Sequence, residues 1–195
     1  MSSMLRNTTT RYGWAAIVLH WLIGLIFIGQ FVLGWAMVRI ASQRTSFELI
    51  QLHKSFGFLL LGLVLIRIGW RLGNASPGLP EEVGAMERRA APSVHLALYA
   101  AQLVVPLSGW ALVSVSVLEI PSMPFNLFVM PNLPLGVSEQ AENFWIFSHK
   151  WLAYAAIALV VLHILAAFRH HFWLRDVVLV RMISPFVANR AGKPE

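Results

Sequence analysis

Four long apolar runs, almost free of charge, constrain this sequence more than any other feature. They are expected to form helices at about residues 14–38, 49–70, 90–118 and 144–168. The first run alone spans roughly 37 Å as a helix, which is enough to cross a bilayer. Only 12% of the residues are charged, against about 25% in a soluble domain. The sequence therefore predicts an all-α, integral membrane four-helix bundle and excludes a nucleic-acid-binding module.

The first apolar run follows Arg6 and Arg11, as the core of a signal peptide would. It is much longer than the roughly 7–15 apolar residues of such a core, and no convincing small-residue cleavage site follows it. We therefore expect a helix that the protein retains.

Basic residues are unequally divided between the two predicted sides of the membrane. Eleven of the 15 lysines and arginines lie on the side that holds both termini and the 71–89 loop. The positive-inside rule makes that side cytoplasmic. We expect residues 1–185 to form one transmembrane domain, residues 186–195 to form a cytoplasmic tail, and the outer 119–143 loop to contain a short helix or folded lid.

Histidines inside the apolar runs are the main functional candidates, because polar groups in a bilayer are costly. His149 and His163 share the fourth run, and their 14-residue spacing places them roughly 21 Å apart on nearly one helix face. His53 is expected at the depth of His149, and His20 at the depth of His163. For any one histidine, a simple hydrogen bond between helices is the alternative.

Two cross-helix histidine pairs at two depths suit two haems, each held by two imidazoles. His20 and His163 would hold the inner haem iron, and His53 and His149 the outer one. Zinc is the rival metal, but it normally takes three or four ligands, often thiolates or carboxylates. The chain has no cysteine, and no acidic residue lies deep in a run.

Small residues near the histidines are consistent with flat macrocycles. Gly24 and Gly57 each follow a proposed ligand by four positions, on the same helix face. Gly34 follows His20 by 14 positions and would face the outer haem. The alternative is that glycine is simply common in membrane helices.

Other polar residues in or near the apolar runs have more than one candidate role. Arg67 follows His53 by 14 positions and would neutralise a propionate of the inner haem, unless it only marks the membrane boundary. His95 is a candidate spare ligand, propionate contact or proton relay. His170 and His171 are interpreted as an interfacial pair rather than as iron ligands.

Four segments carry a resemblance to a known family. They read RYGWAAIVLHWL, LIQLHKSFGFLLLGLVLIRIGWR, HLALYAAQLVVPLSGW and HKWLAYAAIALVVLHILAAFRHHFWLRDVVLVRM. With them the chain resembles the bacterial cytochrome b561 family of small di-haem membrane proteins, over about residues 11–185. The resemblance implies two haem b groups on the same four histidines, in the bacterial inner membrane.

The resemblance also implies an activity, since the best-studied one in this family is the oxidation of periplasmic superoxide with ubiquinone as the electron acceptor. Superoxide is an anion, and the outer side carries four cations that would guide it: Arg39, Arg44, Lys54 and Lys150. For the two lysines, interfacial extension toward water is the alternative.

Two other functions stay open. Related cytochromes anchor a periplasmic dehydrogenase or hydrogenase and relay its electrons to quinone. The other alternative is a haem-free membrane protein that uses its histidines to move protons. The expected partners are membrane lipid, quinone and superoxide, together with a periplasmic redox protein or a second copy of the chain.

Overall fold

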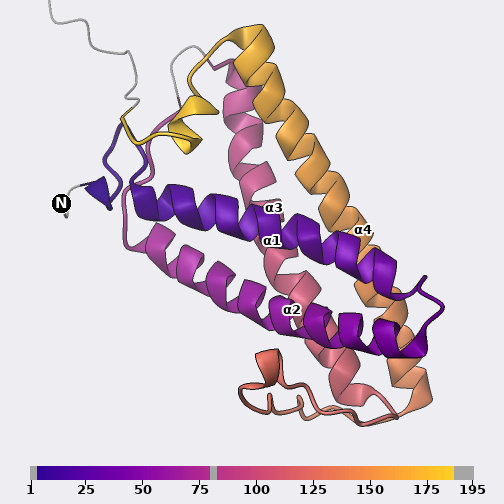
Figure 1. Cartoon of the computed structure of the whole chain (residues 1–195). Coiled ribbons are helices and arrows are strands. Elements are labelled where there is room, and N and C mark those ends of the chain that lie inside the picture. The colour runs from indigo at the N-terminus through magenta and orange to yellow at the C-terminus, as the bar shows by residue number, and fades with distance from the viewer. Residues whose placement is uncertain (1–3, 80–82, 187–195) are drawn as a thin grey trace, which may run out of the picture. The chain divides into compact units, whose positions relative to one another are not determined.

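A computed structural model describes residues 4–79 and 83–186. Its four long helices are α1 (Trp14–Met37), α2 (Gln43–Leu72), α3 (Ala85–Val115) and α4 (Glu139–Phe168) (Figure 1). Three short turns follow α3 and α4: η2 (Pro124–Asn126), the π-helical η3 (Arg169–Leu174) and η4 (Val180–Met182). No strand occurs within the described ranges, so the predicted all-α class is confirmed.

Helix ends differ from the apolar runs where polar residues extend or stop a helix. α2 begins at Gln43 rather than at residue 49, after Ser42, whose hydroxyl accepts a hydrogen bond from the Thr45 amide at 3.4 Å. α4 likewise begins after Ser138, whose hydroxyl accepts from the Ala141 amide at 3.2 Å. Such N-caps satisfy free amide groups at a helix start. Polar first turns are therefore helical although they lie outside the apolar runs.

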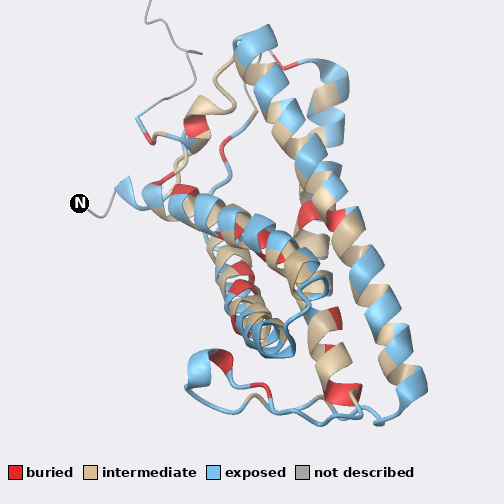
Figure 2. Cartoon of the chain, turned by 45° about the vertical axis from the view of Figure 1, so that its right-hand side comes forward, coloured by how far each residue is buried: buried red, intermediate tan, exposed pale blue. Residues whose placement is uncertain are grey.

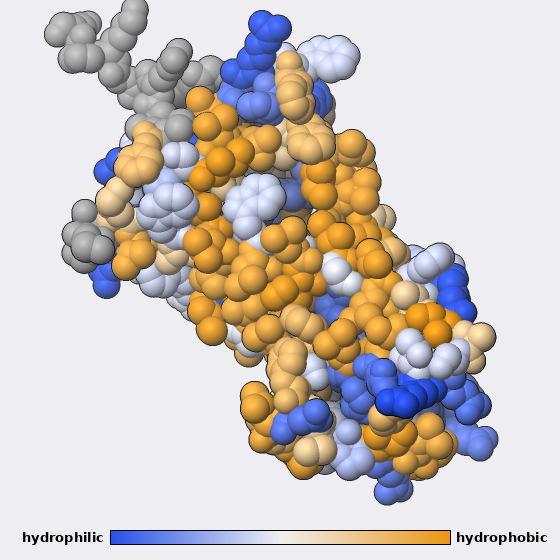
Figure 3. Space-filling view, viewed as in Figure 1, coloured by the Kyte–Doolittle hydropathy of each residue, from blue (hydrophilic) through white to orange (hydrophobic). Residues whose placement is uncertain are grey.

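Apolar side chains cover the outside of the helices. Few helical residues are buried, and many large apolar ones are exposed (Figures 2 and 3). All four long helices are long and apolar enough to cross a membrane. A soluble protein rarely exposes so much apolar surface, so these helices belong in lipid.

The fold consists of two compact units. Unit 1 comprises residues 1–23, 65–98 and 159–195, and unit 2 comprises residues 24–64 and 99–158. Each long helix contributes one segment to each unit, so each unit by itself contains four segments of the long helices. The buried apolar side chains of the two units include Ile17, Ile23 and Leu98 in unit 1 and Phe27, Leu60, Val64 and Ala156 in unit 2.

Residues 116–138 of unit 2 form an ordered loop between α3 and α4. It contains η2 and a bridge between Ser122 and Met130, so the short helix expected here is present. The Trp110 indole donates to the Pro131 carbonyl at 3.0 Å, and the Leu133 amide donates to the Ser114 hydroxyl at 2.9 Å. The loop is thus fixed to α3 by hydrogen bonds.

The predicted tail of residues 186–195 lies outside the described residues except for Phe186. Before it, Arg181 is buried and its guanidinium donates to the carbonyls of Gly78 and Thr10 at 2.9 and 2.8 Å. Burial lowers the pKa of Arg181. This arginine therefore links three chain segments of unit 1.

Candidate haem sites

Unit 2 brings two of the predicted ligands together. The ring centroids of His53 on α2 and His149 on α4 are 6.1 Å apart, and their planes make an angle of 84°. Two metal–imidazole bonds of about 2.0–2.1 Å, plus roughly 1.1 Å from each nitrogen to its ring centre, would place two rings about 6 Å apart. The pair therefore has the separation of two imidazoles that share one metal ion.

Two glycines make room for these rings. A Cβ atom on Gly34 would lie 3.1 Å from Cε1 of His53, and one on Gly109 would lie 3.1 Å from Cε1 of His149. Ordinary carbon contacts are longer, at about 3.5–4.0 Å. Gly34 was predicted to face this site, and in the structure it lies directly against the ring of His53, a predicted ligand.

The His149 ring is held in a defined orientation. Its Nδ1 lies 2.9 Å from the Ser108 hydroxyl and 3.1 Å from the Val105 carbonyl. A carbonyl can only accept, so Nδ1 carries the proton and Nε2 keeps its lone pair for a metal. Outer hydrogen bonds of this kind orient metal-ligating histidines.

A cavity of about 160 Å³ lies beside the two rings. Most of its lining is apolar, with Gln30 and Lys54 as polar exceptions. Nδ1 of His53 is buried here without a hydrogen-bond partner among the described residues. A mostly apolar cavity, two facing imidazoles and glycine-sized gaps together fit a haem.

Unit 1 brings together the other pair and a third histidine. The ring centroids of His20 and His163 are 6.1 Å apart with planes at 70°, and His95 lies 5.9 Å from His163. Arg67 places Nη2 3.3 Å from Nδ1 of His20 and Nη1 3.4 Å from the Ala16 carbonyl. This site therefore contains the same ring spacing beside a cation.

The glycines predicted to follow the ligands have different surroundings. A Cβ atom on Gly24 would meet nothing within 4 Å, whereas one on Gly57 would lie 3.3 Å from the Gln30 amide nitrogen. Gly57 also lines the cavity of unit 2. Gly24 thus lies in open space, and Gly57 makes room for a neighbouring polar side chain.

The four predicted superoxide-guiding cations make separate contacts. Arg44 pairs with Glu48 at 3.0 Å, and Arg39 stacks on the Trp35 ring at 4.2 Å. Lys150 lies 5.9 Å above the Trp151 ring. Lys54 lines the cavity, and its ammonium lies 3.4 Å from the loop carbonyls of both Ile120 and Pro121. Of the four, Lys54 alone lies on the cavity.

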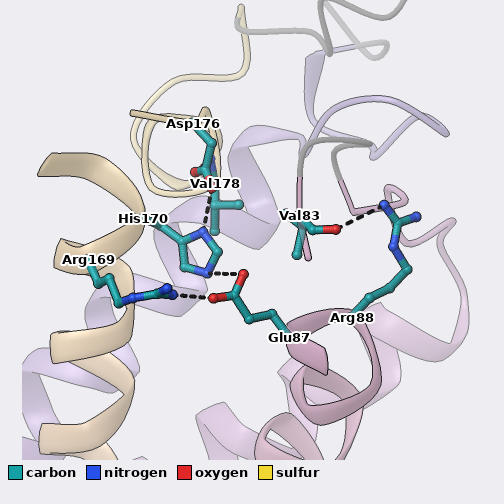
Figure 4. A network of polar contacts seen from close by, with 7 residues as sticks. All are labelled: Val83, Glu87, Arg88, Arg169, His170, Asp176 and Val178. Carbon is teal, nitrogen blue, oxygen red and sulfur yellow. Dashed lines mark hydrogen bonds and ion pairs between the residues drawn. The ribbon is translucent and has the colours of Figure 1, made fainter. Parts of the chain in front are cut away.

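A polar network in unit 1 surrounds His170 (Figure 4). Glu87 at the start of α3 pairs with Arg169, and its other oxygen lies 3.9 Å from Nε2 of His170. Nδ1 of His170 contacts the Asp176 carboxylate. His171 instead packs against the Phe172 ring at 4.8 Å. The two histidines are therefore not equivalent, and His170 fastens η3 to α3.

The structure adds three residues that the sequence analysis missed: Gln30, Ser108 and Gly109. Gly109 follows His95 by 14 positions, the offset that pointed to Gly34, so this signal was available. Gln30 is the only amide side chain in the first apolar run. No group of three or more His, Cys, Asp or Glu residues suited to a metal ion occurs in the described part of the chain.

Comparison with known proteins agrees with this geometry. Residues 11–185 match the family model described as prokaryotic cytochrome b561. The chain is 35% identical over 179 residues to "Cytochrome b561 homolog 2" of Escherichia coli (strain K12), covering 91% of this chain and 94% of that protein. It is 25% identical over 178 residues to "Probable superoxide oxidase CybB" of Yersinia pestis, covering 89% and 96%. The chain belongs to the prokaryotic cytochrome b561 family.

Proposed function

We propose that this protein is a di-haem b-type membrane cytochrome that oxidises superoxide and reduces ubiquinone. Family membership implies haem b and electron transfer in a bacterial membrane. The observation that supports two haems is the repeated 6.1 Å ring separation, once in each unit. His53 and His149 would hold one iron, and His20 and His163 the other.

Haem b, when bound, supplies a one-electron redox couple. Two histidines would hold each haem, and electrons would pass to and from it without a bond between the substrate and the iron. The apolar lining of the unit 2 cavity excludes water from the ligand rings. In the net reaction, two superoxide ions each lose one electron to become dioxygen, and ubiquinone takes up two electrons and two protons.

Superoxide as the donor is supported by the relative named as a probable superoxide oxidase, at 25% identity. Lys54 lines the cavity beside His53 and His149 and is the candidate for attracting the anion. Lys150, Arg39 and Arg44 would add to the local positive potential. We place both termini in the cytoplasm of a bacterium, from the unequal distribution of lysine and arginine.

A second candidate is an electron-relay subunit for a periplasmic dehydrogenase or hydrogenase. One observation favours it: the fixed loop exposes the consecutive apolar side chains Leu127, Phe128 and Val129. Co-purification of a stoichiometric redox enzyme, lost when these three are changed to serine, would support this alternative.

The proposed activity is tested with purified protein in detergent or liposomes. We expect b-type absorbance that superoxide reduces and ubiquinone reoxidises, with superoxide dismutase abolishing the reduction. Haems that superoxide does not reduce would exclude superoxide oxidation while leaving electron relay intact.

A further inference from the structure

Gln30 is a buried amide in the apolar segment of α1 that belongs to unit 2. It is 9% exposed and lines the cavity next to His53. Its Nε2 donates to the backbone carbonyl of His53 at 2.7 Å. A glutamine in a lipid-spanning helix is costly unless its polar atoms form hydrogen bonds. This bond involves the amide nitrogen and leaves the amide oxygen, Oε1, without a partner among the described residues.

Two polar atoms of opposite character are left unpaired at this cavity. Oε1 of Gln30 and Nδ1 of His53 are both buried without a hydrogen-bond partner among the described residues. Oε1 can only accept, and Nδ1 carries a proton when Nε2 binds a metal. The partner ligand, His149, already has acceptors at its Nδ1. His53 lacks one, and the amide oxygen of Gln30, which lines the same cavity, is a group of the missing type.

Gly57 leaves space for the side-chain amide of Gln30 beside the backbone carbonyl of His53. A Cβ atom at this position would lie 3.3 Å from Nε2 of Gln30, closer than the usual contact of about 3.5–4.0 Å. A side chain at Gly57 would therefore push the amide away from the carbonyl of His53.

We propose that Gln30 is a positioning residue for His53: its amide nitrogen holds the backbone of the ligand, and its amide oxygen accepts the Nδ1 proton, directly or through one water molecule. This inference rests on the proposed ligation of haem by His53. An accepted Nδ1 proton makes the imidazole a stronger donor and stabilises ferric iron, which lowers the reduction potential.

The test is a redox titration of the purified, haem-loaded protein, followed by optical and EPR spectra. Gln30→Leu should retain haem and raise the potential of the haem that His53→Ala removes. Gln30→Glu, which keeps an acceptor, should give the wild-type potential or a lower one. Gln102→Leu is the matched control, because Gln102 in unit 2 also has a buried unpaired Oε1 but does not line the cavity.

Gly57→Ala should shift the potential in the same direction as Gln30→Leu, and it should have no added effect in a Gln30→Leu background. An unchanged potential in haem-loaded Gln30→Leu would overturn the inference and leave the haem assignment standing. If His53→Ala removes no haem, the ligand assignment itself fails, which is a different result.

Discussion

The histidine pairs of unit 1 and unit 2 have the same ring separation, 6.1 Å, but different neighbours. In unit 2, Nδ1 of His149 contacts two oxygen atoms, from Ser108 and Val105. In unit 1, Nδ1 of His20 lies 3.3 Å from the guanidinium of Arg67, which is a cation. The same ring separation therefore occurs in two different electrostatic surroundings.

These surroundings predict an order of reduction potentials. Hydrogen-bond acceptors enrich an imidazole and favour ferric iron. A nearby cation disfavours the more positive, ferric state through Coulomb repulsion. We therefore expect the haem of unit 1 to have the higher potential, which favours electron movement from unit 2 to unit 1.

The largest effects should come from the ligands. His163→Ala and His20→Ala should remove the same haem, and His149→Ala and His53→Ala the other, with haem content falling from about two to about one per chain. Optical redox titration identifies the component that is lost. Because His95 also lies 5.9 Å from His163, His95→Ala is the decisive control and should retain both haems. Loss of haem in His95→Ala but not in His20→Ala would transfer ligation to His95.

The next largest effects should come from glycine substitutions, which should affect the haem of unit 2 and spare the haem of unit 1. Gly34→Val and Gly109→Val would push against the rings of His53 and His149, which a single Cβ would already approach to 3.1 Å. Both should lose most of the unit 2 haem and keep the unit 1 haem. Gly29→Ala, at a position with no predicted role where a Cβ atom would meet nothing within 4 Å, should leave both haems in place. Equal loss of both haems would show that these glycines act on folding instead.

Substitutions of Arg67 test whether its charge causes the expected difference in reduction potential between the two haems. Arg67→Leu should lower the potential of the unit 1 haem by an amount on the order of tens of millivolts, because a nearby positive charge is removed. Arg67→Lys should restore part of the shift, and the unit 2 potential should not move. A potential that is the same in all three proteins would remove the proposed cause of the difference.

Ser108 should give the smallest effect. Ser108→Ala removes one of the two acceptors at Nδ1 of His149 and leaves the Val105 carbonyl. The unit 2 potential should rise slightly, with haem content unchanged, as redox titration would show. A fall in potential would contradict the proposed direction of the hydrogen bond.

Much of this arrangement was predictable because helical periodicity is simple. The lengths of the apolar runs predicted the four helices. The 14-residue offset predicted that His149 and His163 share one helix face, and that Gly34 faces the outer site. Long side chains were less predictable, because their direction depends on contacts across the chain. Lys54 lies near loop carbonyls 66 and 67 positions away, and the polar network that holds His170 involves Glu87. Neither partner follows from local spacing.

We propose that each chain holds two haems, each between two histidines. The most direct measurement is haem content per purified chain, combined with low-temperature EPR of the ferric protein. We predict two low-spin haems per chain with strongly anisotropic signals, since the ring planes make angles of 70° and 84°. A single haem per chain, or a high-spin iron with an open axial position, would contradict the claim.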